Sequence, residues 1–594
     1  MATINSNGTG GGDWNAGPTW VGGSVPDTTD RANIVSGDTV TLSANPTNSI
    51  GSCGLEGTLE CTNTPLITIL GDGNGSVMFH QGTLTGDCDL KITGGSAKEI
   101  ADIGTGNFND IELDNSGNTL TIGNGTLTVD GDLTITAGTL NTSASSNFAL
   151  TVTGKTTIGD ASHGSEDQAT LTCNASAISL GSGKTDGYAI EMLAGGTFAG
   201  GAANHTTGAI KQTVANTKFT FTSATTTINS EYTSQDRMFE LTAGKVYNAD
   251  GRITLTGAFT SGIQWTGPSG DTGPYTLRIN DASLTVKPRN TLYVEENLNI
   301  DAGTFNTQYD GSDKDLTVTE QCLVNGGTLT LNGSTVNVGD MSITSGTVNG
   351  NTSTINLNTG TGGGWVWYHS GGTWNYNTST VVYKTNGKHM EGEFYNLTIE
   401  CAADTNTGVW RADGLASVIM KCANDLTVKE GIWKRDAAAE TMTIDGDVLI
   451  EDGGTLGQTS ATGADNFGSL TIASGGTYVA TSGITSILSS ASNYAIDNGG
   501  TFTHNDGTVT IGPDASNQWL KGSGTGAYYN LISDNSSSLG MGVGADLVVD
   551  NDLTINASKK LGFVGASYDI TVTGSVLVSG NFTTSTIPTG DHTF

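Results

Sequence analysis

The chain has 594 residues and a formal charge of −34, because 58 Asp and Glu residues outnumber 24 Lys and Arg residues. It contains 86 glycines, and charged residues make up 14% of it, compared with about 25% in ordinary soluble domains. This composition favours short β-strands joined by many turns. The charge disfavours nucleic acid and anionic membranes as partners, and no apolar run reaches the roughly 18 residues that span a membrane.

The N-terminal region carries a tryptophan-rich motif. Residues 13–42 include Trp14, Trp20 and a Gly-Gly-Ser-Val-Pro turn that ends at Pro26. This segment resembles the opening of glycine-rich parallel β-helix surface proteins of environmental tailed phages and bacteria. In those proteins such a stretch leads into the first coils. Because a solenoid must protect its open end from edge-to-edge association, we expect Trp14 and Trp20 to form a structural cap.

The first residues bear on localisation. Met1 to Asn5 include neither a basic nor an apolar segment, and so they do not resemble a signal peptide. We therefore expect synthesis in the host cytosol, release on lysis, and a final location on the virion exterior. Display on the outer surface of a bacterium is the alternative.

A repeat of about one coil length predicts the fold. Apolar triplets recur on either side of an Asp-Leu or Asn-Leu corner, so that Leu127 precedes Leu150 by 23 residues and Met420 precedes Met442 by 22. Within each coil apolar residues alternate, which turns one face inward. The pattern predicts an all-β parallel β-helix, or β-solenoid, with ~22-residue coils in which equivalent residues stack. A string of β-sandwich domains is the alternative fold.

Two sets of residues are expected in the core of this solenoid. The first set comes from the coil repeat: Leu127, Leu133, Leu150, Leu298, Leu426 and Leu553. The second set follows a Gly-Gly-Thr motif, whose glycines suit tight corners. Its members are Phe198, Leu329, Trp374, Leu456, Tyr478 and Phe502.

The repeats also suggest how the chain is organised. Residues 1–50 form the cap and first coil, and residues 51–270 form the first part of the solenoid. Residues 271–390 form a second repeat block with an aromatic-rich segment, and residues 391–594 contain the third and fourth repeat blocks.

The seven cysteines are scattered and show no CxxC spacing. Cys422 occupies the position that Val129, Val294 and Val549 hold in the other repeats. We therefore expect all seven to be buried thiols and not a disulfide framework.

Candidate catalytic and metal-binding residues are few. Aspartates one coil apart, such as Asp110 with Asp132 or Asp534 with Asp552, could form the carboxylate pair of a glycosidase, but Asp marks corners throughout, so no catalytic residue is assigned. Asp310, Asp313 and Asp315 are spaced as in a calcium site or as in a solvated corner loop. Calcium is the one cofactor that the sequence suggests.

An aromatic segment offers a candidate glycan-binding surface. Trp365 and Trp367 alternate and should share one face of a strand. A flat aromatic row can stack on sugar rings, or it can fill the core or a subunit interface. The candidate residues are Trp365, Trp367, Tyr368, Trp374 and Tyr376.

Together these patterns predict a structural surface protein of a tailed phage, such as a fibre, appendage or decoration, that adheres to host glycan. The expected partners are other virion proteins, host surface glycan and two further copies of the chain, because flat solenoid faces can pack around one axis. A tailspike-type polysaccharide depolymerase and a bacterial surface adhesin are the alternative functions.

Overall fold

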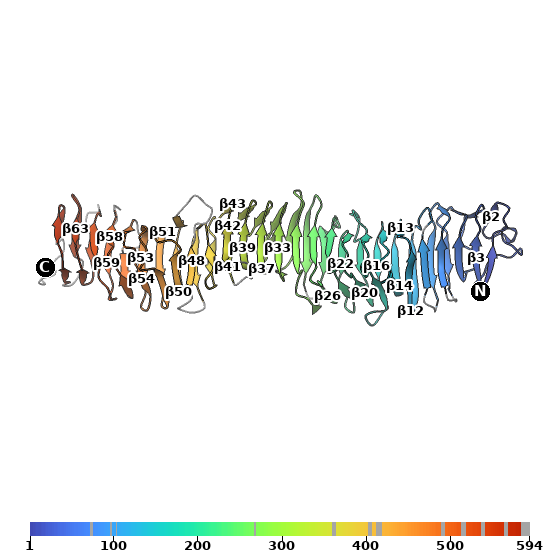
Figure 1. The fold of residues 1–594 in the computed structure, drawn as a ribbon, viewed down its shortest axis with the longest axis horizontal. Helices are drawn as coiled ribbons and strands as arrows, with labels where there is room; N and C mark the ends of the chain where they lie inside the picture. The colour runs from blue at the N-terminus through green and yellow to red at the C-terminus, as the bar shows by residue number, and fades with distance from the viewer. Residues whose placement is uncertain are drawn as a thin grey trace. The chain divides into compact units, whose positions relative to one another are not determined.

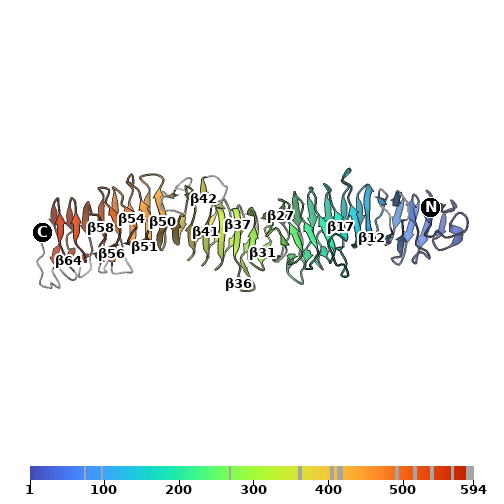
Figure 2. The same ribbon diagram turned by 90° about the horizontal axis from the view of Figure 1, so that it is seen from below.

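The computed structural model describes residues 1–71, 75–94, 98–102, 104–266, 269–358, 364–401, 407–410, 419–488, 494–512, 518–535, 541–563 and 568–583. The chain forms two compact units, Met1–Lys314 and Asp315–Phe594. Strands make up 53% of the protein and helix 1%, and the strands form the parallel stacked coils of a β-solenoid. The predicted fold class is therefore confirmed. Figures 1 and 2 show the strands of each unit stacked coil after coil.

A coil in the middle of unit 1 contains three short strands. One coil consists of β19 (Ile190–Met192), β20 (Gly196–Ala199) and β21 (His205–Thr207). The next consists of β22 (Ile210–Gln212), β23 (Lys218–Thr220) and β24 (Thr225–Ile228). Each strand pairs in parallel with its counterpart, β19 with β22, β20 with β23 and β21 with β24. Gly or Asn-rich corners separate the strands, so no hairpin is needed to close a coil.

Unit 2 repeats this plan. One ladder runs through β55 (Ile484–Ile487), β58 (Thr508–Ile511), β60 (Asn530–Ser533) and β63 (Leu553–Ile555). A second ladder runs through β56 (Tyr494–Asn498), β59 (Gln518–Lys521), β61 (Met541–Val543) and β64 (Lys560–Phe563). All of these pairings are parallel, as the repeat predicts.

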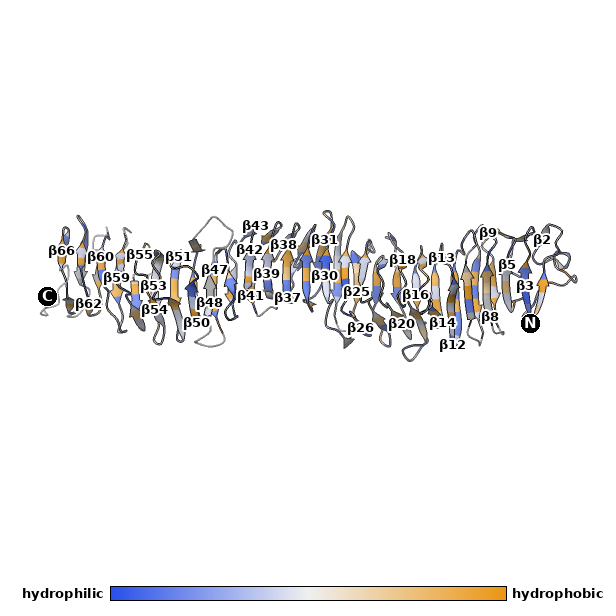
Figure 3. Cartoon of the chain, viewed as in Figure 1, coloured by the Kyte–Doolittle hydropathy of each residue, from blue (hydrophilic) through white to orange (hydrophobic). Residues whose placement is uncertain are grey.

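The coil spacing in the sequence corresponds to the register of the ladders. Leu127 of β13 (Leu127–Val129) lies opposite Leu150 of β15 (Leu150–Val152), and Met420 lies opposite Met442. The longer interval between Leu397 and Leu426 also ends in a direct pair. The six leucines expected in the core are all no more than 1% exposed. Burial of each contributes roughly 1.5–3 kcal/mol, and Figure 3 shows the underlying alternation of apolar and polar residues along the strands.

The Gly-Gly-Thr corners also place their apolar residue as predicted. Leu456, Tyr478 and Phe502 occupy one inward row in three successive coils. The six residues that follow this motif are all buried, with Trp374 the most exposed at 9%. At the corner before Tyr478, Gly475 has a φ of +86°, which glycine adopts without steric cost.

The cysteines follow the prediction with one exception. Cys53, Cys173, Cys322, Cys401 and Cys422 are free and buried, and Cys422 lies opposite Ile444 in the ladder that the repeat predicts. Cys61 and Cys88, by contrast, form a disulfide, with Cα atoms 5.6 Å apart across 27 residues of sequence. The expectation of seven free thiols was therefore wrong for this pair, because stacking brings the end of β6 (Thr58–Cys61) beside the residue preceding β10 (Asp89–Thr93).

Candidate functional site

The two N-terminal tryptophans pack against each other in unit 1. Trp14 is 0% and Trp20 is 2% exposed, and their rings meet edge to face with centroids 5.1 Å apart. The indole N–H of Trp20 donates a hydrogen bond of 2.7 Å to the backbone carbonyl of Trp14. The short 3-10 turn η1 (Gly17–Thr19) between them gives the segment its compact shape.

This segment also covers an edge of the first coil. Trp20 forms an antiparallel bridge with Ser6, and Val21 N–H donates to the Asn5 carbonyl at 2.9 Å. On its opposite side, Ser6 N–H donates to Asn33 of the following coil at 2.8 Å. Among the described residues of unit 1, no coil pairs with the side of Asn5 and Ser6 that the tryptophan segment occupies, which is the position that a cap requires.

The aromatic segment does not form the exposed row expected from its sequence. Trp367 is 0% and Trp374 is 9% exposed, and their rings meet at 4.9 Å. The cause is a register shift between Trp365 and Trp367 in β42 (Trp365–His369), which makes Val366 an extra residue in its ladder with β45 (His389–Met390). Both Val366 and Trp367 are buried as a result. Trp367 and Trp374 are therefore core residues, and their assignment to a glycan-binding surface was wrong.

The other aromatic residues of this segment remain partly exposed. The ring of Trp365 lies 5.5 Å from that of Tyr368 and 5.4 Å from that of His389. Tyr376 is also half-buried, at the corner that follows β43 (Thr373–Asn375). Trp365, Tyr368 and Tyr376 are the residues of the predicted glycan site that a ligand could reach.

The three aspartates suggested as calcium ligands lie in different local settings. Asp310 occupies the turn of a small antiparallel hairpin, β35 (Gln308–Tyr309) with β36 (Ser312–Asp313), in unit 1. Asp313 accepts a hydrogen bond of 3.0 Å from the Gln308 amide. Asp315 begins unit 2 and accepts one of 2.8 Å from Thr335 N–H. Within the described residues, no group of three His, Cys, Asp or Glu side chains could hold a metal ion.

The corner aspartates have a structural role. Asp110 accepts a hydrogen bond of 2.7 Å from the backbone N–H of Asp132 one coil later. Asp132 in turn accepts one of 2.6 Å from Lys155 N–H, and Asp552 accepts one of 2.9 Å from Ser575 N–H. Each carboxylate thus satisfies a backbone donor of the next coil, where the ladder turns a corner.

Both aspartate pairs that the sequence suggested as candidate carboxylate pairs include carboxylates that bind the neighbouring coil. Burial raises the pKa of Asp110, and the neighbouring charges of Asp89 and Asp132 raise it further. Asp534 accepts a hydrogen bond of 3.0 Å from the side-chain amide of Asn556. These carboxylates therefore hold successive coils together.

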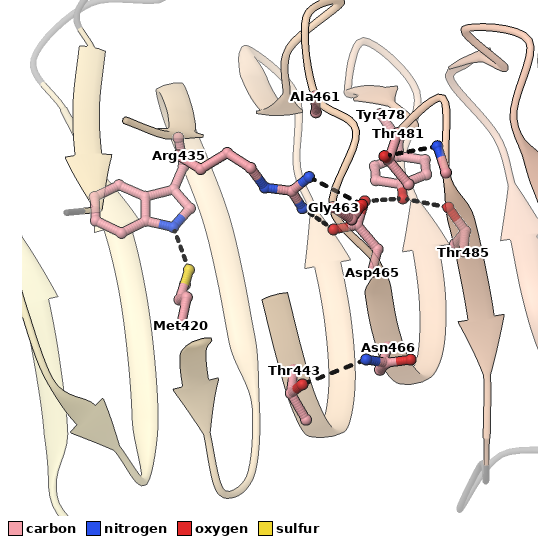
Figure 4. A network of polar contacts seen from close by, with 12 residues as sticks. Met420, Arg435, Thr443, Ala461, Gly463, Asp465, Asn466, Tyr478, Thr481 and Thr485 are labelled. Atoms are coloured by element: carbon pink, nitrogen blue, oxygen red, sulfur yellow. Dashed lines mark hydrogen bonds and ion pairs between the residues drawn. The ribbon is translucent and has the colours of Figure 1, made fainter. Parts of the chain in front are cut away.

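A buried charged network lies inside unit 2 (Figure 4). Arg435, at the end of β50 (Leu426–Arg435), pairs with Asp465 at the start of β53 (Asp465–Ile472). The Tyr478 hydroxyl donates to Asp465 at 2.8 Å and lies 3.1 Å from the Thr485 hydroxyl. The side chains of Arg435 and Asp465 are only 3% and 2% exposed. Burial raises the pKa of Asp465, although the charge of Arg435 opposes this.

A different part of unit 2 forms an open groove. On its outer face, two rows of side chains run across β56, β59 and β61, and glycine interrupts both. One row contains Tyr494, Trp519, Gly542 and Gly562 in register. In the other, Asp497 pairs with Lys521, and Gly544 follows because its N–H donates to the Leu520 carbonyl at 2.7 Å. At Gly544 no side chain projects from the strand, and the surface is hollowed there relative to the neighbouring Lys521.

The side chains beside this depression form a compact cluster. Lys521 Nζ lies 3.5 Å from Asp497 Oδ2 and 4.6 Å from the centre of the Tyr494 ring. The rings of Tyr494 and Trp519 meet edge to face at 5.8 Å. The cation is therefore held between a carboxylate and an aromatic face, which orders its long side chain.

The groove has a volume of about 800 Å³. Asp497, Lys521, Asp546 and Tyr568 line it, together with Gly522 and Gly544. A Cβ atom at Gly544 would come no closer than 3.4 Å to any neighbour, so this glycine leaves real space. The groove combines charged side chains that can form hydrogen bonds with a glycine floor, and the rings of Tyr494 and Trp519 lie beside it through Lys521. Polar groups next to aromatic rings are typical of small-molecule binding sites.

Sequence reasoning missed this groove although its signal was present. Lys521 and Gly544 are 23 residues apart, as are Trp519 and Gly542, so the coil repeat itself would have stacked them. The aromatic segment around Trp365 is evident in the sequence because its residues are adjacent, whereas the groove residues come from successive coils.

Comparisons with known proteins give no match, since no family model, curated protein or solved structure is significantly similar to the chain. Among the described residues, no helix is both long and apolar enough to cross a membrane.

Proposed function

We propose that this chain is a structural surface protein of a tailed phage, a fibre, appendage or decoration on the virion exterior, and that it adheres to host glycan. The observation that carries the proposal is the ladder of corner carboxylates, exemplified by Asp110 and Asp132. Through this ladder, acidic residues at the surface also bind one coil to the next, as expected for a rigid, acidic structural protein. The N-terminal resemblance to phage β-helix proteins and the tryptophan cap support the same assignment.

Gold-labelled antibody against the purified chain tests this location. It should decorate phage particles from the source culture, and mass spectrometry of gradient-purified particles should recover peptides of the chain. Sedimentation of the purified chain should give three times the mass of one copy, because the proposed assembly is a homotrimer with other virion proteins as its neighbours. A chain that never accompanies particles would contradict the proposal.

One observation favours a polysaccharide depolymerase as the second candidate. Asp497 and Asp546 line the same groove and come from coils two apart, a separation of about 10 Å along the stack. This is near the upper end of the carboxylate spacing in inverting glycosidases. Release of reducing ends from host polysaccharide, lost in both Asp497→Asn and Asp546→Asn, would favour this enzyme over adhesion.

A further inference from the structure

We infer that the groove on unit 2, together with the aromatic pair Tyr494 and Trp519 beside it, binds an uncharged oligosaccharide. Lys521, Asp497 and Asp546 of the groove supply the polar contacts, and Lys521 also contacts the ring of Tyr494, which stacks on the sugar with Trp519. The inference rests on the proposed adhesive function and deepens it, because it names the site and the class of glycan. It also moves the glycan site away from the segment around Trp365.

The first argument concerns the aromatic residues. Most large apolar side chains in unit 2 point inward, as Leu456, Tyr478 and Phe502 do. Tyr494 and Trp519 instead lie in an outward row, half-buried and in contact with each other. Their exposed faces keep apolar surface in water, which is unfavourable until a ligand covers it. The apolar C–H face of a pyranose ring matches such a surface.

The second argument concerns space. The row that contains Trp519 continues with Gly542 and Gly562, and the row that contains Lys521 continues with Gly544. A ligand that lies beside the rings can therefore extend over the next coil at Gly544, where a Cβ atom would come no closer than 3.4 Å to a neighbour. Each coil adds about 4.8 Å, so this coil accommodates about one further sugar ring.

The third argument concerns charge. Asp497 and Asp546 are opposed in the groove by Lys521, and the chain as a whole carries a formal charge of −34. An anionic glycan would be repelled both locally and at longer range. Hydroxyl and acetamido groups, by contrast, can donate to the carboxylates and accept from the ammonium group. The groove therefore selects neutral hexoses or N-acetylhexosamines over uronic acids.

The experiment uses the full chain and an immobilised panel of oligosaccharides of neutral hexoses, N-acetylhexosamines and hexuronic acids. We expect binding to at least one uncharged class and at least tenfold weaker binding to the uronic acids at low salt. Trp519→Ala should weaken the binding tenfold or more, and Trp519→Phe should retain most of it. Equal or tighter binding of the uronic acids, or no binding of any uncharged probe, would overturn the inference.

A second variant separates loss of the site from loss of folding. Gly544→Gln should fill the groove with little strain, because a Cβ atom there meets only ordinary contacts at 3.4 Å and beyond. It should abolish binding while the thermal unfolding curve stays unchanged. Thr427→Gln, at an outward position of another strand of unit 2, is the matched control and should bind as the unmodified chain does. Binding that survives Gly544→Gln would place the ligand elsewhere.

These outcomes are independent of where the chain resides. A chain found on phage particles that binds no uncharged glycan would retain the proposed location and lose the groove assignment. A chain that binds uncharged glycan through Trp519 but never accompanies particles would retain the groove assignment and lose the proposed location.

Discussion

His205 is a buried histidine through which acid should act on the core of unit 1. It is 4% exposed and lies in an inward row between Ile178 and Thr226, with its ring edge to face with Phe198 at 6.1 Å. Burial lowers its pKa from 6.5 to about 4. The unfolded chain therefore binds a proton between these pH values that the folded chain does not bind.

Stability of the coils around His205 should consequently be complete above pH 6.5 and fall as the pH decreases toward 4. The loss should reach about 3 kcal/mol, since one pKa unit corresponds to about 1.4 kcal/mol. Hydrogen exchange of peptides from β21 and its neighbours measures this locally. His205→Leu should flatten the profile, because the variant has no imidazole to protonate at this position. An unchanged profile in His205→Leu would show that another group is responsible.

The cysteines give a second prediction at the residue scale. Burial raises the pKa of Cys53 and of Cys322 to about 12 and raises the pKa of Cys422 further still. These thiols should therefore be protonated and inaccessible at neutral pH, and maleimide labelling of the native chain should be slow. Non-reducing digestion followed by mass spectrometry should recover Cys61 and Cys88 in one linked peptide. Rapid native labelling of Cys422 would contradict its position in the core.

At the scale of a strand, the inward and outward faces of β63 should respond differently to the same substitution. Leu553 is 1% exposed and stacks between Leu531 and Val576, whereas Thr554 is half-exposed on the other face. Leu553→Asp should destabilise its coil by several kcal/mol, because a carboxylate there would be buried without a partner. Thr554→Asp should change stability by less than about 0.5 kcal/mol. Equal effects in denaturant unfolding would mean that the strand does not present one face to a core.

The buried network between β50, β53 and β54 (Thr477–Val479) gives another prediction at this scale. Asp465→Asn should destabilise unit 2 by about 3–5 kcal/mol, because it leaves the Arg435 charge in the core without compensation. Replacing both residues, with Arg435→Met and Asp465→Leu, should restore most of that loss. The Tyr478 hydroxyl keeps Thr485 as a partner at 3.1 Å. A double variant as unstable as the single one would contradict this account of the pair.

The same elements show how far the sequence alone could be interpreted. The stacking of Leu127 on Leu150 was predictable because a buried face demands apolar residues at a fixed coil interval. The burial of Trp367 was not, because it depends on one extra residue in β42, and a bulge of that kind has no sequence signature here. The groove was predictable only in part. The coil interval places Gly542 and Gly544 next to Trp519 and Lys521, but the hollow that results is seen only in the stacked coils.

At the scale of the whole chain, each unit is held together by contacts between neighbouring coils. Backbone ladders, inward rows and corner carboxylates all act between a residue and its counterpart one coil later, as with Asp110 and Asp132. Stability in such a fold is approximately a sum of coil and interface contributions, and so damage to one coil should remain local. Binding at a surface groove then requires only the few coils that form it.

Short-range cross-linking of engineered cysteine pairs tests the parallel, in-register stack most directly. Thr128 lies opposite Thr151, and Thr151 lies opposite Ser179 in the following coil. Thr128→Cys combined with Thr151→Cys should be joined rapidly by a short thiol cross-linker, whereas Thr128→Cys combined with Ser179→Cys, about 10 Å apart, should not. The buried native thiols should not interfere. No cross-link in the first pair, or equal yields in both pairs, would contradict the solenoid on which the proposed function rests.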